Sequence, residues 1–165
     1  MARGTSTIEA IYRRHVQTVY RLCYSYLGSS AEAEDATQAT FMKLVEHPRS
    51  FESEEHEKAW LIVAAKNHCL DVLKSAAHSR VVTLDENVPE PSVEDEVFAD
   101  EPSEVMQAIR RLPEKYKDVL FLFYYEGRQT DEIARMLGSP PSTIRNRLAD
   151  ARALLKRELE GGGRT

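Results

Sequence analysis

Residues 130–159 read TDEIARMLGSPPSTIRNRLADARALLKREL and predict two helices joined by a tight turn. We expect a short helix capped by Thr130, a turn that begins at Gly138, and a longer helix from about Pro141 to Leu159. The order of short helix, turn and longer helix is the helix-turn-helix arrangement. The apolar residues spaced to pack the two helices together are Ile133, Ala134, Leu137, Ile144, Leu148 and Leu155.

The beginning of the longer helix predicts a surface for DNA. Its outward side chains are donors suited to base edges and phosphates in a major groove, and the helix N-terminus adds N–H groups that attract phosphate. An ordinary helical hairpin with a solvated basic face is the alternative, and the turn glycine and the small Ala134 favour DNA binding. The outward donors are Ser142, Thr143, Arg145, Asn146 and Arg147, and Arg152, Lys156 and Arg157 extend the positive charge.

The distribution of charge supports this interpretation, although the total does not. The chain has 165 residues and a net charge of −5. Residues 85–104 contain nine acidic residues and no Lys or Arg, and the remaining residues sum to +4. Residues 142–165 contain six basic and three acidic residues. Because DNA binding depends on a local basic face, the acidic total does not exclude it.

The first part of the chain predicts a module of three helices. Apolar residues recur at helical spacing over residues 6–27, 29–47 and 57–77. The third helix has the densest apolar positions, and we expect it to be the most buried of the module. The apolar face of the second helix is predicted to be Phe41, Leu44 and Val45.

A change in composition follows this module. Residues 78–102 contain three prolines and many acidic residues, and such a segment cannot bury a core of its own. A short strand over residues 81–84 is an alternative to an extended chain there. Helices over residues 103–111 and 113–125 then precede the helix-turn-helix. We therefore predict an all-α chain of two small helical domains, residues 6–77 and 103–160, joined by an acidic linker, residues 78–102, with a disordered tail, residues 161–165.

The sequence does not support a membrane protein, an exported protein, a disulfide-bonded protein or a metalloprotein. No apolar run approaches the roughly 18 residues of a membrane span, and the first residues lack the apolar core of a signal peptide. We therefore predict a cytoplasmic protein without membrane insertion. Cys23 and Cys69 are far apart in sequence without CxxC spacing, which favours buried thiols over a disulfide. The histidines form no metal-ligand pattern, and we predict no metal, no cofactor and no catalytic residue.

The chain resembles the sigma-70 family of RNA polymerase sigma factors in three stretches. Residues 112–159, LPEKYKDVLFLFYYEGRQTDEIARMLGSPPSTIRNRLADARALLKREL, resemble the promoter-binding C-terminal domain. Residues 12–46, YRRHVQTVYRLCYSYLGSSAEAEDATQATFMKLVE, resemble the first two helices of the domain that binds core polymerase, and residues 58–74, KAWLIVAAKNHCLDVLK, resemble its promoter-melting helix. Two domains without further ones are typical of the extracytoplasmic-function type.

The resemblance implies a transcription initiation factor with three groups of site residues. The positions that dock on core RNA polymerase are Glu34, Asp35, Gln38, Phe41, Met42 and Leu44. The positions at the −10 element are Phe51, Lys58, Asn67, His68, Asp71 and Lys74. The positions at the −35 element are Ser142, Thr143, Arg145, Asn146, Arg147 and Arg152. The implied partners are core RNA polymerase, double-stranded promoter DNA and the melted non-template strand, with an anti-sigma protein as a further partner.

Three stretches depart from the family pattern, and one of them, SAAHSR at residues 75–80, is less basic than usual. The loop FESEEHEK, residues 51–58, contains four glutamates, which repel phosphate unless they face away. Pro140 and Pro141 stand where a serine cap and an acidic residue are usual. Trp60 is expected in the core rather than as a stacking platform. The alternative function is a stand-alone helix-turn-helix regulator, which predicts dimers on palindromic sites. An enzyme is a third hypothesis, and no convergent set of titratable residues supports it.

Overall fold

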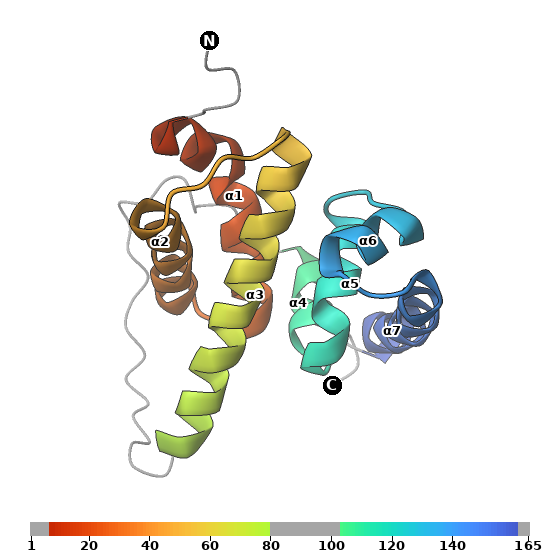
Figure 1. Ribbon diagram of the computed structural model, residues 1–165. Coiled ribbons are helices and arrows are strands. Elements are labelled where there is room, and N and C mark those ends of the chain that lie inside the picture. The colour runs from red at the N-terminus through yellow and green to blue at the C-terminus, as the bar shows by residue number, and fades with distance from the viewer. Residues whose placement is uncertain (1–6, 80–102, 162–165) are drawn as a thin grey trace. The chain divides into compact units, whose positions relative to one another are not determined.

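The computed structural model describes residues 7–79 and 103–161 (Figure 1). The chain divides after Asp100 into two compact units, and every regular element among the described residues is an α-helix, as predicted. Residues 80–102 of the predicted linker, including the alternative strand, and residues 162–165 of the predicted tail lie outside the described residues. Within residues 7–79 and 103–161, no helix is both long and apolar enough to cross a membrane.

The first unit contains three helices, α1 (Ile8–Leu27), α2 (Ser30–Glu46) and α3 (Glu54–Ser79), which pack against one another. α3 begins three residues earlier than the sequence predicts. The Ser53 hydroxyl accepts a hydrogen bond from the His56 N–H at 3.0 Å, and acidic residues are favoured in the first turn of a helix. The second half of the predicted loop 51–58 is therefore helical, and α3 also continues two residues beyond its predicted end.

The most buried helix of this unit is α1, and the prediction that it would be the third helix is wrong. Nine residues of α1 are buried, among them Val19 and Leu22 without any exposure. In contrast, Leu70, Val72 and Leu73 of α3 are only half-buried. The dense apolar positions late in α3 thus lack complete cover, whereas α1 buries residues along its whole length.

Three polar side chains tie α1 to the beginning of α3. Glu57 is 5% exposed, and Arg14 donates from Nη2 to both of its carboxylate oxygens, at 3.0 and 2.9 Å. His15 lies 2.9 Å from Glu57 Oε1 through its Nε2. A buried carboxylate needs such partners because its desolvation is costly. This cluster therefore fixes where the first turn of α3 contacts α1.

The two cysteines meet inside the same unit. Cys23 of α1 and Cys69 of α3 are both fully buried and free. A hydrogen bond with the Cys23 thiol, together with burial, raises the pKa of the Cys69 thiol. The sequence correctly predicts buried thiols, but it gives no sign that the two are neighbours.

The second unit contains four helices, α4 (Glu104–Arg110), α5 (Glu114–Tyr124), α6 (Thr130–Leu137) and α7 (Pro141–Gly161). α7 packs against the other three, and Arg111 Nε donates to Glu158 Oε1 at 2.8 Å. The larger buried apolar residues are Met106, Ile109, Leu112, Val119, Leu120, Phe121, Leu122, Ile133, Ile144, Leu148 and Leu155.

A buried lysine joins α4 to α5. Lys117 is 3% exposed, and its Nζ donates to the Arg110 carbonyl oxygen at 2.6 Å. Carbonyl groups at a helix C-terminus lack intrahelical partners and attract cations. Burial, and to a smaller extent the charge of Arg110, lowers the pKa of Lys117 to about 8, while Glu114 opposes this shift.

We expect Glu57→Gln to lower the free energy of unfolding of the first unit by about 2 kcal/mol, because Arg14 loses its buried charged partner. Trp60, the single tryptophan of the chain, lies on α3, so its fluorescence during urea unfolding reports on this unit. Glu52→Gln is the matched control, since Glu52 is exposed, and it should cost less than about 0.5 kcal/mol. If both variants lower the free energy of unfolding equally, the cluster of Arg14, His15 and Glu57 does not stabilise the first unit.

The stability of the second unit should rise with pH because of Lys117. Its pKa is about 8 when folded and about 10.4 in an unfolded chain, so the unfolded chain binds more protons in this window. From pH 8 to 9.5, the free energy of unfolding should rise by about 1.5 kcal/mol relative to Lys117→Met. Hydrogen exchange of peptides from residues 103–161 measures this difference. A difference that does not change with pH would show that Lys117 keeps an ordinary pKa.

Candidate nucleic-acid interface

The helix-turn-helix of the sequence is present as α6, a short turn and α7. Gly138 ends α6 in the left-handed conformation, with φ 68° and ψ 34°, and the Ser139 N–H donates to the Ala134 carbonyl oxygen at 3.0 Å. α7 begins at Pro141 as predicted, and the Pro140 carbonyl accepts the first helical hydrogen bond from Ile144 at 3.2 Å. The prolines therefore leave the helix start in place, because a proline at the first helical position needs no donor.

The predicted cap of α6 is displaced by one residue. Gln129, rather than Thr130, occupies the cap position, and its N–H donates to Glu132 Oε1 at 2.9 Å. Ile133 and Ala134 of α6 are buried and α6 packs against α7, whereas Leu137 is only half-buried. The burial of the small Ala134 side chain is what a close approach of the two helices requires.

The exposed side of α7 carries the predicted −35 residues at different angles. Consecutive residues of an α-helix are rotated by about 100°, so Ser142 and Asn146 share a face, directly opposite the buried Ile144 and Leu148. Arg145 and Arg147 lie on opposite flanks of that face. Arg145 is exposed and Arg147 is half-buried. The arrangement gives a polar centre with one cation on each side.

Two more predicted −35 residues are placed by their neighbours. Arg152 lies seven residues after Arg145 and is on the same flank of α7. Its guanidinium stacks over the Phe123 ring at 5.0 Å, which holds it against α5. Thr143 is half-buried and lies between the exposed face and the core.

On α2, the residues predicted to dock on polymerase divide between surface and core. Asp35, Gln38 and Met42 are exposed on one face, and Glu34 is half-buried beside them. Phe41 and Leu44 are 4% and 1% exposed, so their side chains do not reach a partner surface. We correct these two assignments: the family resemblance placed both residues at the polymerase, whereas their helical spacing predicted an apolar face of α2, and the observed burial agrees with the spacing.

The structure adds one residue to this face and explains its orientation. Val45 is 49% exposed, close to the 51% of Met42, although the sequence suggested that it packs with Phe41. On the opposite side, Thr37 and Thr40 are buried and donate to the Ala33 and Ala36 carbonyls at 2.7 and 2.8 Å. Their hydroxyls are thereby satisfied inside the core, and the α2 face keeps an exposed apolar pair beside a carboxylate.

On α3, three of the predicted −10 residues form one exposed row. Asn67, Asp71 and Lys74 are exposed and follow one another at helical spacing. His68 is half-buried at the edge of this row. Lys58 precedes Asn67 by nine residues, which is about half a turn around the helix, so it lies on the other side of α3 and does not join the row.

The loop before α3 is held by aromatic contacts. Phe51 is buried, with its ring centroid 5.1 Å from His56 and 6.0 Å from Trp60, so it is a core residue rather than a DNA contact. Trp60 is half-buried, and the Arg49 guanidinium lies 4.9 Å above its ring. The expectation of a core Trp60 is thus only partly met, because one side of its ring faces a cation near the surface.

Part of the acidic charge in this loop is neutralised within the protein. Glu57 is buried on Arg14 and His15, and Glu54 Oε2 lies 3.6 Å from Arg14 Nε. Repulsion of phosphate by the stretch FESEEHEK is therefore weaker than its four glutamates suggest. In the part of the chain that the structure describes, no three His, Cys, Asp or Glu side chains are placed to hold a metal ion.

Comparison with known families gives matches to both units. The family model described as Sigma-70 region 2 matches residues 11–79, and the model described as Sigma-70, region 4 matches residues 103–155. The ECF RNA polymerase sigma factor SigL of Mycobacterium tuberculosis is 30% identical, over 99% of this chain and 95% of its own length. The ECF RNA polymerase sigma factor SigW of Bacillus subtilis is 29% identical, over 86% of this chain and 82% of its own length.

A solved structure agrees with the fold. The sigma factor RpoE of Bartonella quintana, solved in complex with the anti-sigma factor NepR, matches with a TM-score of 0.67 at 23% identity, over 94% of this chain and 98% of the other. This likeness concerns the fold alone. The coverage of nearly the whole chain by SigL, at 30% identity, settles the family: the chain belongs to the ECF sigma factors of the sigma-70 family.

Proposed function

We propose that this chain binds core RNA polymerase and directs it to promoters by reading a −35 element with α7 and a −10 element with α3. The observation that carries the proposal is the exposed face of α7, with Ser142 and Asn146 at its centre and a cation on each flank. The same chain carries a second exposed face on α2, which a DNA-binding hairpin alone does not need.

The geometry of α7 supports separate roles for its side chains in the major groove, with some at base edges and others at phosphates. Ser142 and Asn146 would face base edges, for which a hydroxyl and an amide can both donate and accept. Arg145 and Arg147, on opposite flanks, would each reach a phosphate on one side of the groove. Arg152, stacked on Phe123, would add a further phosphate contact at a fixed position.

The face on α2 would dock on the polymerase. Met42 and Val45 supply exposed apolar area, and Asp35 lies beside them. Apolar contacts at the centre of an interface contribute most of its affinity, while a charge at the rim favours a partner of opposite sign. We therefore expect a basic and apolar partner helix on the polymerase.

The row Asn67, Asp71 and Lys74 would follow the melted non-template strand, with Asn67 able to donate and accept toward an unpaired base. The reduced charge of the acidic loop supports this path. RNA synthesis itself would remain with the polymerase, so we propose that the chain is not an enzyme. We also propose that it acts in the cytoplasm.

The first test is size-exclusion chromatography of the full chain with core RNA polymerase at moderate salt. We expect a stable complex with one chain per core, because the α2 face presents a preformed surface. Binding to DNA fragments without any polymerase complex would overturn the proposal in favour of the stand-alone regulator.

Arg145→Ala combined with Arg147→Ala should weaken the binding of holoenzyme to double-stranded promoter DNA by roughly ten- to a hundred-fold, because two charged contacts are lost. The probe is a promoter fragment selected with the wild-type holoenzyme from a random library, and the readout is a gel-shift titration. Arg13→Ala combined with Lys115→Ala removes the same charge elsewhere and is the control. Unchanged promoter affinity in the first variant would exclude these arginines from the interface.

Asp35→Arg should weaken the binding of core polymerase by about ten-fold or more, because a reversed charge meets a basic partner. The fold should persist, since this helix face is solvated; circular dichroism checks this. Glu52→Arg reverses another exposed charge of the same unit and serves as the control. Competition against fluorescently labelled wild-type chain measures the affinity. If both variants bind as the wild type does, Asp35 lies outside the docking face.

A further inference from the structure

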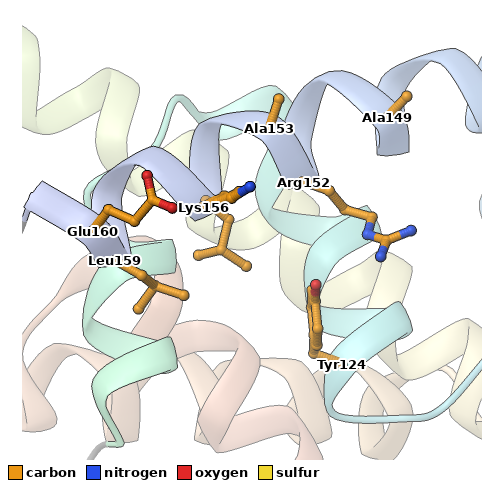
Figure 2. Close-up of a pocket in the computed structure, with 8 residues that line it drawn as sticks. Tyr124, Ala149, Arg152, Ala153, Lys156, Leu159 and Glu160 are labelled. Atoms are coloured by element: carbon orange, nitrogen blue, oxygen red, sulfur yellow. The ribbon is translucent and has the colours of Figure 1, made fainter.

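An open groove runs along α7 in the second unit, and Arg152 is the residue of its lining that also takes part in the DNA contacts proposed above. Its floor and walls include Tyr124 at the end of α5 and the small side chains of Ala149 and Ala153. Tyr124 and Leu159 are 44% and 40% exposed, so two large side chains with apolar surface border the groove. Figure 2 shows Arg152 extending from α7 toward Tyr124. The groove therefore has an apolar surface that the described residues leave open.

The charges around the groove favour an acidic occupant. Arg152 and Lys156 line it from α7, and Glu160 is the one acidic residue among its lining side chains. Glu158, the next acid on this end of α7, is occupied by Arg111 at 2.8 Å. An occupant should therefore combine a short apolar centre with several carboxylates.

Residues 94–101 of this chain have that composition. The stretch reads EDEVFADE, in which Val97 and Phe98 are preceded by three acids and followed, after Ala99, by two. Nothing else in the sequence joins a large aromatic residue to five acids within eight positions. The chemistry of this stretch is complementary to the groove in both its apolar and its charged parts.

The attachment point of this stretch contacts the end of α5, the helix that contributes Tyr124 to the groove. Ser103 precedes α4, and its Oγ lies 2.7 Å from the hydroxyl of Tyr125, the residue that follows Tyr124. Phe98 is five residues before Ser103, a chain length that spans up to about 17 Å. The part of the groove between Ala149 and Glu160 extends about 16 Å along α7. A tether this short gives the stretch a high effective concentration at the groove.

We propose that residues 94–101 dock in the groove formed by Tyr124 and α7, with Phe98 as the apolar anchor and the flanking acids beside Arg152 and Lys156. Arg145 lies on the same flank of α7 as these two cations. The docked stretch therefore competes with DNA phosphates for that flank in the free chain. The docking is independent of the proposed function, whereas the competition with DNA rests on it.

The first experiment tests docking in the full chain without DNA or polymerase. Ala99→Cys combined with Ala153→Cys is oxidised under mild conditions, and the disulfide is identified by mass spectrometry; the native cysteines are buried. We expect an intramolecular disulfide that forms at least about five-fold faster than in the control, Val82→Cys with Ala153→Cys, whose tether is longer. Adding Val97→Ser and Phe98→Ser should remove this advantage.

Equal rates in the test and control pairs, or a rate that is unaffected by loss of Phe98, would overturn the docking. A disulfide between two chains would instead assign the groove to a second copy and would also overturn it.

The second experiment tests the competition. Val97→Ser with Phe98→Ser should raise the affinity of the free chain for double-stranded DNA by about ten-fold, because burial of a phenylalanine stabilises the docked form by at least that factor. Val81→Ser with Val82→Ser is the matched control, and fluorescence anisotropy is the readout. An intramolecular disulfide without any gain in DNA affinity would support the docking and overturn the competition. If the complex of the wild-type chain with core polymerase does not bind double-stranded promoter DNA at all, the proposed function itself is refuted.

Discussion

Each helix of this protein persists because it buries one face against its neighbours, since helices of this length are marginal by themselves in water. The first unit satisfies this constraint by packing three helices together, with α1 buried along its length. The second unit satisfies it by packing α4, α5 and α6 against α7. The faces left exposed on α2, α3 and α7 are the ones available to partners, so the same packing that stabilises the units selects their candidate binding surfaces.

Polar groups inside the first unit refine that selection. Glu57 is buried on Arg14 and His15, which fixes the beginning of α3 and neutralises one carboxylate of its first turn. The threonines of α2 return their hydroxyls to the backbone and stay inside. As a result, α2 presents Met42 and Val45 outward, and α3 presents Asn67. The negative charge of the glutamates before and within the first turn of α3 would repel DNA, and pairing inside the protein neutralises part of it.

The second unit combines an exposed polar and basic face on α7 with an open groove. The Gly138 turn and the buried Ile133, Ile144 and Leu148 fix α7 relative to α6, so that the donors near its N-terminus are preorganised. The groove beside Tyr124 lies on the flank that also carries Arg152. A surface that attracts phosphate also attracts carboxylates, which is why an acidic stretch of the same chain is a natural competitor for it.

The sequence by itself determined the all-α class, the helix-turn-helix and most helix ends, because these depend on local periodicity, caps and breakers. The family came from the resemblance of three stretches of the sequence to sigma-70 factors. It also placed Ser142, Arg145 and Asn146 on the exposed side of α7. Only the tertiary structure decided that Phe51 is core, that Val45 is exposed although Phe41 and Leu44 beside it are buried, and that Cys23 meets Cys69. Periodicity shows that a residue lies on a given face of its helix, but whether that face is covered depends on how far each neighbouring helix extends, and residues distant in sequence supply that cover.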